Sequence, residues 1–366
     1  MNRQIFSKFR LKDKEFKNRL FLAALATQYA DKNGRVTDSM IQYYIHYALT
    51  GVAFLVVEAA SVSNEGRGWS RQLSANHIDA LPGLTRLADE IGERGSLPIL
   101  QLHHAGRQAL PSDKNNIVVG PSAIRCPVLN RPVRVLSPKE ISQLVEKFTF
   151  SAELAYKAGF QGIELHGAHG YLLHQFVSPI TNKRDDEYGL NNPEPYKFPL
   201  EVVRSLRLNF PKMLIFYRIS ARDYLPKGLT IDKTLPFVQR LLENGVDLIS
   251  VSGGMYQSLH GPESIVGPST PMGVFRNDSR AIKEFTKAPI AVTGKIQFPS
   301  LADEIITNGE ADLIGLGRMI LRDNDWVRKA SGEVLEPVRE CLLCNRCNYH
   351  KRGCPDDSDK PFWLRE

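Results

Sequence analysis

Two histidines and a tyrosine lie close together in the segment His166-Gly167-Ala168-His169-Gly170-Tyr171. They directly follow Gly162-Ile163-Glu164-Leu165, a short apolar run that begins at a glycine and is typical of a buried strand. Imidazole N–H groups can hold an oxygen that gains negative charge, and a phenol can donate a proton. We therefore predict that His166, His169 and Tyr171 are catalytic. The alternative, two surface histidines and a packed tyrosine, is weakened by three such groups meeting at one strand exit.

Two later strand ends carry glycine beside a cation. They are Thr293-Gly294-Lys295 and Gly315-Leu316-Gly317-Arg318. In a parallel α/β barrel, the loops after the last two strands form the usual phosphate site. Glycine lets backbone N–H groups approach an anion, and Lys295 and Arg318 can pair with it. Glycine at a strand end is often only a turn residue, but a cation at both positions favours a ligand that carries phosphate.

The third group of reactive residues lies near the end of the chain. Four cysteines have the spacing C-x2-C-x2-C-x6-C: Cys341, Cys344, Cys347 and Cys354. The fifth cysteine, Cys126, is far away in the sequence. In a cytosolic protein such clustering favours a metal site over disulfides. The residues alone leave three options open, namely an iron–sulfur cluster, a structural zinc ion or unligated thiols.

These groups must be positioned by a scaffold, and the chain shows eight strand-like apolar runs separated by helical patterns. The runs cover residues 20–25, 52–57, 97–102, 162–165, 213–219, 246–251, 289–293 and 312–316. Eight strands, each followed by a helix, predict an α/β protein with the (β/α)8 TIM barrel fold. A doubly wound sheet is the main alternative. It requires a glycine-rich turn after the first strand, and no GxGxxG pattern occurs there.

Two helix starts are marked by capping residues. Thr37 precedes an amphipathic segment that we expect to end at Gly51. Ser137-Pro138-Lys139-Glu140 has the pattern of a capping box with proline at the first helical position, and this helix should run to Gly159.

Three long segments are rich in Gly, Pro, Ser and Asn and only weakly periodic. They are residues 105–135, 178–199 and 255–277. Each one follows the C-terminal end of an expected strand. Loops of this length in a compact domain are usually lids or binding loops, so we expect them to crowd one mouth of the barrel.

Composition sets the broad class of the protein. With 366 residues, the chain can form one large barrel or two ordinary domains. A hydrophobic content of 42% with 24% charged residues is typical of a globular protein. The net charge of +7 is scattered without a dense basic run, so we expect no nucleic-acid partner. Because the sequence has no membrane-length apolar run and no signal-peptide core at its start, we expect a cytoplasmic protein without a membrane partner.

Many short motifs in this chain occur in the order found in one known family. They are Asn18-Arg19 with residues 23–27, Glu58-Ala59, residues 65–68, 101–107 and 166–171, Ser178-Pro179, residues 182–184 and 186–189, Arg218-Ile219-Ser220 and Gly317-Arg318. Together they resemble the Old Yellow Enzyme family of FMN-dependent ene reductases, from about Phe6 to Arg328. The resemblance implies a TIM barrel that binds FMN at the C-terminal ends of its strands. We accordingly expect an FMN-binding barrel over residues 1–337 and a cysteine-rich tail over residues 338–366.

The resemblance also implies which residues bind the flavin. Backbone groups would line it at Ala23, Ala24, Leu25 and Ala26. Ala59 would pack near the ring, and the Gln101 amide would hydrogen-bond its pyrimidine edge. Arg218 would lie beside N1 and C2=O, where a fixed cation stabilises the reduced flavin. The phosphate would lie at the second site described above, with Gly294, Lys295, Gly317 and Arg318.

The implied reaction has two halves that share one pocket. NADH or NADPH passes hydride to the flavin and leaves, and an α,β-unsaturated carbonyl or enoyl-type substrate takes its place. His166 and His169 would hold the carbonyl oxygen, and Tyr171 would protonate the α-carbon. The expected partners are therefore NAD(P)H and a small unsaturated substrate, and we expect the chain to form a homo-oligomer.

Some positions depart from the common pattern of the family. Ala26 stands where a Thr or Cys often contacts the flavin, Gln28 replaces a substrate-contacting tyrosine, and Gly189-Leu190-Asn191 replaces Gly-Gly-Ser. The Ala-Thr pair is similar to the subgroup of 2,4-dienoyl-CoA reductase and trimethylamine dehydrogenase. That subgroup carries a [4Fe-4S] cluster just after the barrel, where the cysteine tail lies here with a narrower spacing. Two alternative functions follow, namely an amine dehydrogenase or demethylase, and a flavin or iron–sulfur module that exchanges electrons with a partner.

Overall fold

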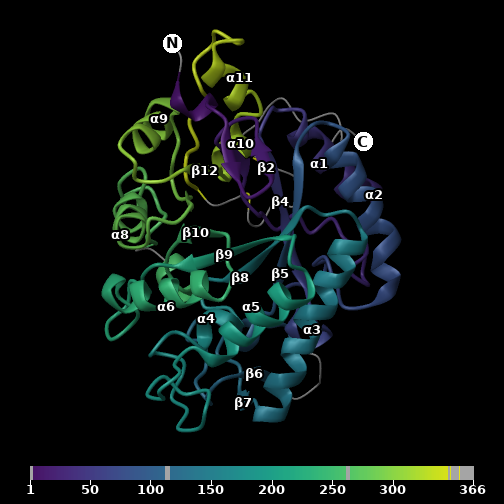
Figure 1. Ribbon diagram of the computed structural model, residues 1–366, viewed down its shortest axis with the longest axis vertical. Helices are drawn as coiled ribbons and strands as arrows, with labels where there is room; N and C mark the ends of the chain where they lie inside the picture. Colours follow the sequence, from purple (N-terminus) through teal and green to yellow (C-terminus); the bar gives the residue numbers. More distant parts are fainter. Residues whose placement is uncertain (1–2, 112–115, 261–263, 345–346, 348–353, 355–366) are drawn as a thin grey trace.

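A computed structural model describes residues 3–111, 116–260, 264–344, 347 and 354 (Figure 1). Eight parallel strands close into a barrel in the order β10-β11-β12-β3-β4-β5-β8-β9. The strands are β3 (Leu20–Leu22), β4 (Phe54–Ser61), β5 (Leu97–His103), β8 (Gly162–Gly167), β9 (Leu214–Ser220), β10 (Leu248–Ser252), β11 (Ile290–Val292) and β12 (Leu313–Leu316). Each corresponds to one of the eight apolar runs, so the predicted TIM barrel is confirmed.

Helices cover the outside of this barrel (Figure 1). The longer ones are α1 (Asp38–Ala48), α2 (Leu81–Gly92), α3 (Pro138–Lys157), α5 (Lys197–Asn209), α6 (Ile231–Glu243), α8 (Arg276–Thr286) and α9 (Pro299–Thr307). Shorter ones are α4 (Leu172–Gln175), α7 (Tyr256–Leu259), α10 (Arg318–Arg322) and α11 (Trp326–Ser331). Both predicted caps are confirmed, because the Thr37 side chain accepts from the Met40 N–H and Ser137 forms a capping box with Glu140. Both helices end slightly before the glycine that was expected to stop them.

The N-terminal end of the barrel is closed by a hairpin that the sequence analysis did not predict. Strands β1 (Phe9–Leu11) and β2 (Lys14–Phe16) pair antiparallel ahead of β3. The Phe16 ring lies 5.2 Å from the Phe54 ring, which in turn stacks at 4.5 Å on Phe21. These rings belong to an apolar cluster formed by residues at the beginnings of the barrel strands. The bottom of the barrel is therefore packed, and a ligand must enter from the other end.

Short elements fill the remaining connections. Four 3-10 turns are η1 (Gln4–Phe6), η2 (Asn64–Gly66), η3 (Ile78–Ala80) and η4 (Gly106–Gln108). The long segment after β5 was expected to lack regular structure, but it contains a parallel pair, β6 (Val118–Gly120) and β7 (Val133–Val135). Figure 1 shows this pair outside the barrel, beside α3. Strands of three residues are too short for local periodicity to reveal.

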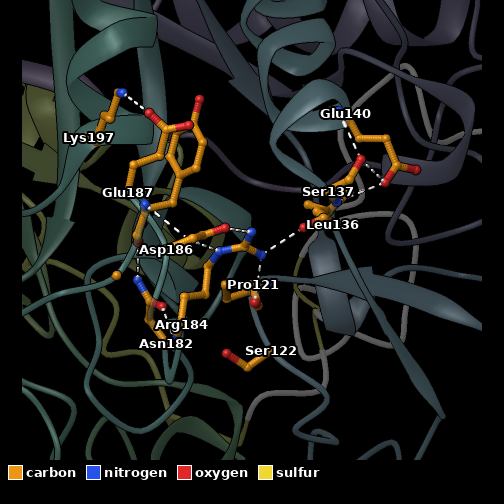
Figure 2. Close-up of polar contacts among 12 residues, drawn as sticks. Pro121, Ser122, Leu136, Ser137, Glu140, Asn182, Arg184, Asp186, Glu187 and Lys197 are labelled. Carbon is orange, nitrogen blue, oxygen red and sulfur yellow. Dashed lines mark hydrogen bonds and ion pairs between the residues drawn. The ribbon is translucent and has the colours of Figure 1, made fainter.

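Arg184 ties the β6–β7 pair to the segment that follows β8 (Figure 2). Its guanidinium donates to the carbonyl of Pro121 at 3.0 Å and to that of Leu136 at 2.7 Å, just after β6 and β7. The same group pairs with the Asp186 carboxylate, with Nε donating to Oδ1 at 2.8 Å. The Arg184 side chain is only 6% exposed. A bidentate, buried guanidinium is rigid, so the two long segments are held in one arrangement relative to each other.

Candidate active site

A cavity of about 470 Å³ opens at the C-terminal ends of the barrel strands. All residues predicted from the sequence to be catalytic or to bind the cofactor line it, namely Ala23, Ala24, Leu25, Ala26, Ala59, Gln101, His166, His169, Tyr171, Arg218, Gly294, Lys295, Gly317 and Arg318. They come from seven different strands or the loops after them. Parallel closure brings them together, because every strand of a TIM barrel presents its C-terminal end to the same mouth.

The two histidines stand side by side in this cavity. Their ring centroids are 5.1 Å apart and their planes nearly perpendicular. The His169 backbone is in the left-handed region with φ of 60°, and two hydroxyls hold it there. Its N–H donates to Ser220 Oγ at 2.9 Å, and its Nε2 lies 2.7 Å from Ser252 Oγ. The Nδ1 atom of His166 has no hydrogen-bond partner among the described residues. A buried imidazole nitrogen without a partner is available to a ligand.

Both imidazoles remain neutral at physiological pH. Burial holds the pKa of His166 well below its usual range, and the neighbouring rings of His169 and His103 and the charge of Arg218 lower it further. Burial and Arg218 likewise hold the pKa of His169 well below that range. A neutral imidazole has one N–H donor and one acceptor nitrogen. The pair therefore suits a ligand oxygen that gains negative charge only during reaction.

Tyr171 completes the cluster, with its ring centroid 4.7 Å from that of His166. Its hydroxyl lies 3.2 Å from the hydroxyl of Tyr256, at the beginning of α7. Burial raises the pKa of Tyr171 well above its ordinary value, and Tyr256 raises it further. The phenol is therefore protonated at neutral pH and can serve as a proton donor.

A buried contact between His174 and Asp223 supports the turn that carries His169 and Tyr171. The Gly170 N–H donates to His174 Nδ1 at 2.8 Å. On the other side of its ring, His174 Nε2 lies 3.0 Å from Asp223 Oδ1, and both side chains are almost fully buried. The Gly170 φ of 77° places a hypothetical Cβ 2.5 Å from the Gln108 side chain, so this turn requires glycine. The His174–Asp223 contact and the hydrogen bond from Gly170 thus hold this turn in place without a ligand.

The strands on either side of β8, β5 and β9, offer polar groups that match a flavin ring. Gln101 and Arg218 both line the cavity, and Arg218 Nε is buried without a hydrogen-bond partner among the described residues. After β3, Ala23, Ala24 and Ala26 contribute small side chains to the cavity wall, with Leu25 among them. A wall without bulky side chains lets a planar ring approach the backbone, and the unpartnered guanidinium nitrogen is suited to an acceptor edge.

The two cations of the predicted phosphate site also contact a neighbouring loop. Lys295 Nζ donates to the Gly267 carbonyl at 2.6 Å, to Thr270 Oγ1 at 3.0 Å and to the Thr270 carbonyl. Arg318 donates to the Val266 carbonyl at 3.1 Å. Burial and the nearby Arg318 charge lower the pKa of Lys295. The side chain of Lys295 thus has three protein acceptors, a use of this residue that the sequence did not reveal.

The cysteines of the tail lie near one another but form no recognisable metal site. Only Cys347 among them lines the cavity. Burial raises the pKa of the Cys347 thiol to about 11, with Arg318 opposing and Cys341, Cys354 and Cys344 contributing. In the described part of the chain, no group of three or more His, Cys, Asp or Glu is placed to hold a metal ion. The rest of the tail, residues 345–346, 348–353 and 355–366, lies outside the described residues.

Several cavity residues were missed by the sequence analysis. They are Trp69, Tyr256, Leu259, His260, Phe275 and Ser252. Ser252 ends β10, so the rule that selected polar residues at strand exits could have found it. Trp69 lies in a loop and Tyr256 begins the short helix α7, and their sequence neighbourhoods carry no comparable signal. No helix within the described ranges is long and apolar enough to cross a membrane.

Comparisons with known proteins match this geometry. A family model for the NADH:flavin oxidoreductase / NADH oxidase family matches residues 4–335. The chain is 33% identical to an NADH oxidase of Thermoanaerobacter brockii over 348 residues, which are 93% of this chain and 52% of that protein. It is also 33% identical to an NADPH dehydrogenase of Bacillus subtilis (strain 168) over 335 residues, covering 91% of this chain and 96% of the relative. The chain therefore spans about half the length of the first relative and nearly all of the second.

Two solved structures share the fold at lower sequence identity. One is a 2-naphthoyl-CoA reductase in complex with 2-naphthoyl-CoA, with a TM-score of 0.87 and 24% identity, covering 93% of this chain and 54% of that chain. The other is an Old Yellow Enzyme homologue from Zymomonas mobilis, with a TM-score of 0.79 and 23% identity, covering 92% of this chain and 94% of that chain. At these identities the likeness establishes the barrel fold.

Proposed function

This chain belongs to the NADH:flavin oxidoreductase / NADH oxidase family, that of the Old Yellow Enzymes, and from that premise we propose that it is an FMN-dependent ene reductase. The family consists of flavin-dependent oxidoreductases that use NADH or NADPH. The proposed substrate is an α,β-unsaturated carbonyl or enoyl-type compound. The observation that carries this proposal is the cluster of two neutral histidines and a protonated tyrosine in the cavity.

The residues at the cavity wall fit FMN. Gln101 and Arg218, whose Nε has no partner among the described residues, would hold the pyrimidine edge, and the glycines and cations after β11 and β12 would hold the phosphate. FMN in this cavity supplies two-electron hydride chemistry between NAD(P)H and the substrate.

The protein's own contribution is to polarise and protonate the substrate. His166 and His169 hold the carbonyl oxygen of the substrate with neutral N–H donors. This withdraws electrons from the conjugated double bond and makes its β-carbon electrophilic. Tyr171 donates its phenolic proton to the α-carbon, on which negative charge develops. An amine dehydrogenase needs no donors for a carbonyl oxygen, so this arrangement favours ene reduction over amine oxidation.

Anaerobic purification tests the proposal most directly. We expect the absorption spectrum of bound FMN, its bleaching by NADH or NADPH, and its return when an enone such as cyclohexenone is added. Bleaching without reoxidation by any of a panel of enones and enoyl thioesters would contradict ene reduction. Iron, sulfide and zinc analysis of the same sample tests the prediction of a [4Fe-4S] cluster at Cys341, Cys344, Cys347 and Cys354. If the sample contains zinc or no metal, the prediction of a cluster is wrong, and the prediction of an electron-transfer partner loses its basis.

Neutralising the two phosphate-site cations should weaken FMN retention. Arg318→Gln removes a charge-assisted partner of the phosphate, and each such bond contributes more than a neutral one. Lys295→Met removes the second charge and also releases the loop around Thr270. We expect the double variant to lose FMN on gel filtration, measured as the ratio of flavin to protein absorbance. A surface control, Arg328→Gln, should keep full occupancy. Full occupancy in the double variant would place the phosphate elsewhere.

A further inference from the structure

Glu164 is a buried carboxylate that the proposed reaction does not use. It lies in the middle of β8 and is 1% exposed. Its register partners are Gln101 on β5 and Phe216 on β9, so it lies between two strands that line the cavity. Burying an ionised carboxylate is costly unless charges and hydrogen bonds compensate it. A carboxylate at this position therefore needs a structural or functional reason.

Three polar side chains surround this carboxylate. The amide Nε2 of Gln101 donates to Glu164 Oε1 at 2.6 Å. Burial raises the pKa of Glu164, whereas the positive charge of Arg218 and hydrogen bonds from Gln101 and Ser250 lower it. In the same way, burial lowers the pKa of Arg218 and the charge of Glu164 opposes this. Arg218 is two residues after Phe216, the register partner of Glu164, so both side chains lie on the same face of the sheet, and each favours the charged form of the other.

The short bond to Glu164 also decides which end of the Gln101 amide faces a ligand. Because the NH₂ group donates to the carboxylate, the amide oxygen is the end of the Gln101 side chain that is available to a ligand in the cavity. An oxygen accepts hydrogen bonds and cannot donate them. Gln101 is therefore prepared to accept from an N–H donor at the edge of a ring, such as N3–H of a flavin. Without a partner for its NH₂ group, the amide could turn over and present a donor instead.

We propose that Glu164 is a positioning residue that orients Gln101 and, by offsetting the charge of Arg218, lowers the reduction potential of bound FMN. This inference rests on the proposed function, since it requires FMN in the cavity. Reduction adds negative charge to the flavin, and Arg218 stabilises that charge. A carboxylate beside Arg218 cancels part of its field, so the reduced flavin is less stabilised and gives up hydride more readily.

The test is the reduction potential of FMN in Glu164→Gln. This substitution removes the charge but keeps an oxygen that can accept from Gln101. We expect reduced FMN to be favoured over oxidised FMN by about tenfold more than in the wild type, a shift of about 30 mV to more positive potential for a two-electron couple. Glu164→Asp keeps the charge and should stay closer to the wild type. Glu310→Gln is the matched control, because Glu310 is equally buried but pairs with Arg276 and Arg280 away from the cavity.

The outcomes separate this inference from the proposed function. If the wild type binds no FMN, the proposed function fails. If FMN binds and Glu164→Gln leaves its potential unchanged or makes it more negative, the inference about Glu164 fails. Should Glu164→Gln not fold with an uncompensated Arg218, the measurement is made in Glu164→Asp, which keeps the charge but shortens the side chain that holds Gln101 and opposes Arg218. Its potential must lie at or above that of the wild type, and a more negative potential would overturn the inference.

Discussion

Replacing Tyr171 by phenylalanine should slow the reoxidation of reduced flavin by an enone about 10²–10⁴-fold, the usual contribution of a general acid. The ring, which lies 4.7 Å from His166, is retained, so the cavity wall should keep its shape. FMN content and the rate of flavin reduction by NAD(P)H should change little, because neither needs a proton from Tyr171. Stopped-flow absorbance measures the two half-reactions separately.

Tyr256→Phe is the matched control for this prediction. It removes the hydroxyl 3.2 Å from that of Tyr171 and leaves the proposed donor in place. We expect a smaller effect on reoxidation than that of Tyr171→Phe. Equal rates for wild type and Tyr171→Phe with a well-activated enone would show that solvent or another residue supplies the proton.

Replacing His166 by alanine should lower kcat/KM for the enone by about 10²–10³-fold, the usual cost of removing one donor from an oxyanion site. The expected cause is the loss of one N–H group from the substrate carbonyl oxygen. Because burial, and to a lesser degree the neighbouring groups, hold the pKa of His166 well below its usual range, the loss should not depend on a charge that titrates near neutral pH. The effect should therefore be similar at pH 6 and pH 8.

His166→Asn distinguishes hydrogen bonding from packing. Its side-chain amide can still donate a hydrogen bond, whereas alanine cannot, so we expect asparagine to recover a measurable part of the lost rate. Ser252→Ala tests the contact of the second histidine, because it removes the hydroxyl beside His169 Nε2 and keeps the imidazole. If His166→Ala and His166→Asn were equally impaired while both retained FMN, the role of His166 would be in packing and not in donation.

Local patterns in the sequence were sufficient for the barrel and for part of its mouth. Eight apolar runs mark the strands, and position at a strand end selected His166 and Lys295, whereas Gln101 and Arg218 were predicted from the family resemblance. They meet in one cavity because closing parallel strands places all C-terminal ends at one mouth, whatever lies between them in the chain. The capping residues Thr37 and Ser137 act within four residues, so their roles could also be inferred from the sequence.

The contacts that prepare the site for chemistry depended on the tertiary structure. Gln101 and Glu164 are 63 residues apart, and Tyr171 and Tyr256 are 85 apart. Their hydrogen bonds depend on the register between strands and on the path of a long loop, neither of which is encoded in a local pattern. The same holds for Lys295, whose position after β11 was predictable but whose three acceptors come from the loop around Thr270. The sequence thus determined most of the residues predicted to reach the cavity. Only the packing of distant segments decided which of their polar atoms are hydrogen-bonded within the protein and which are available to a ligand.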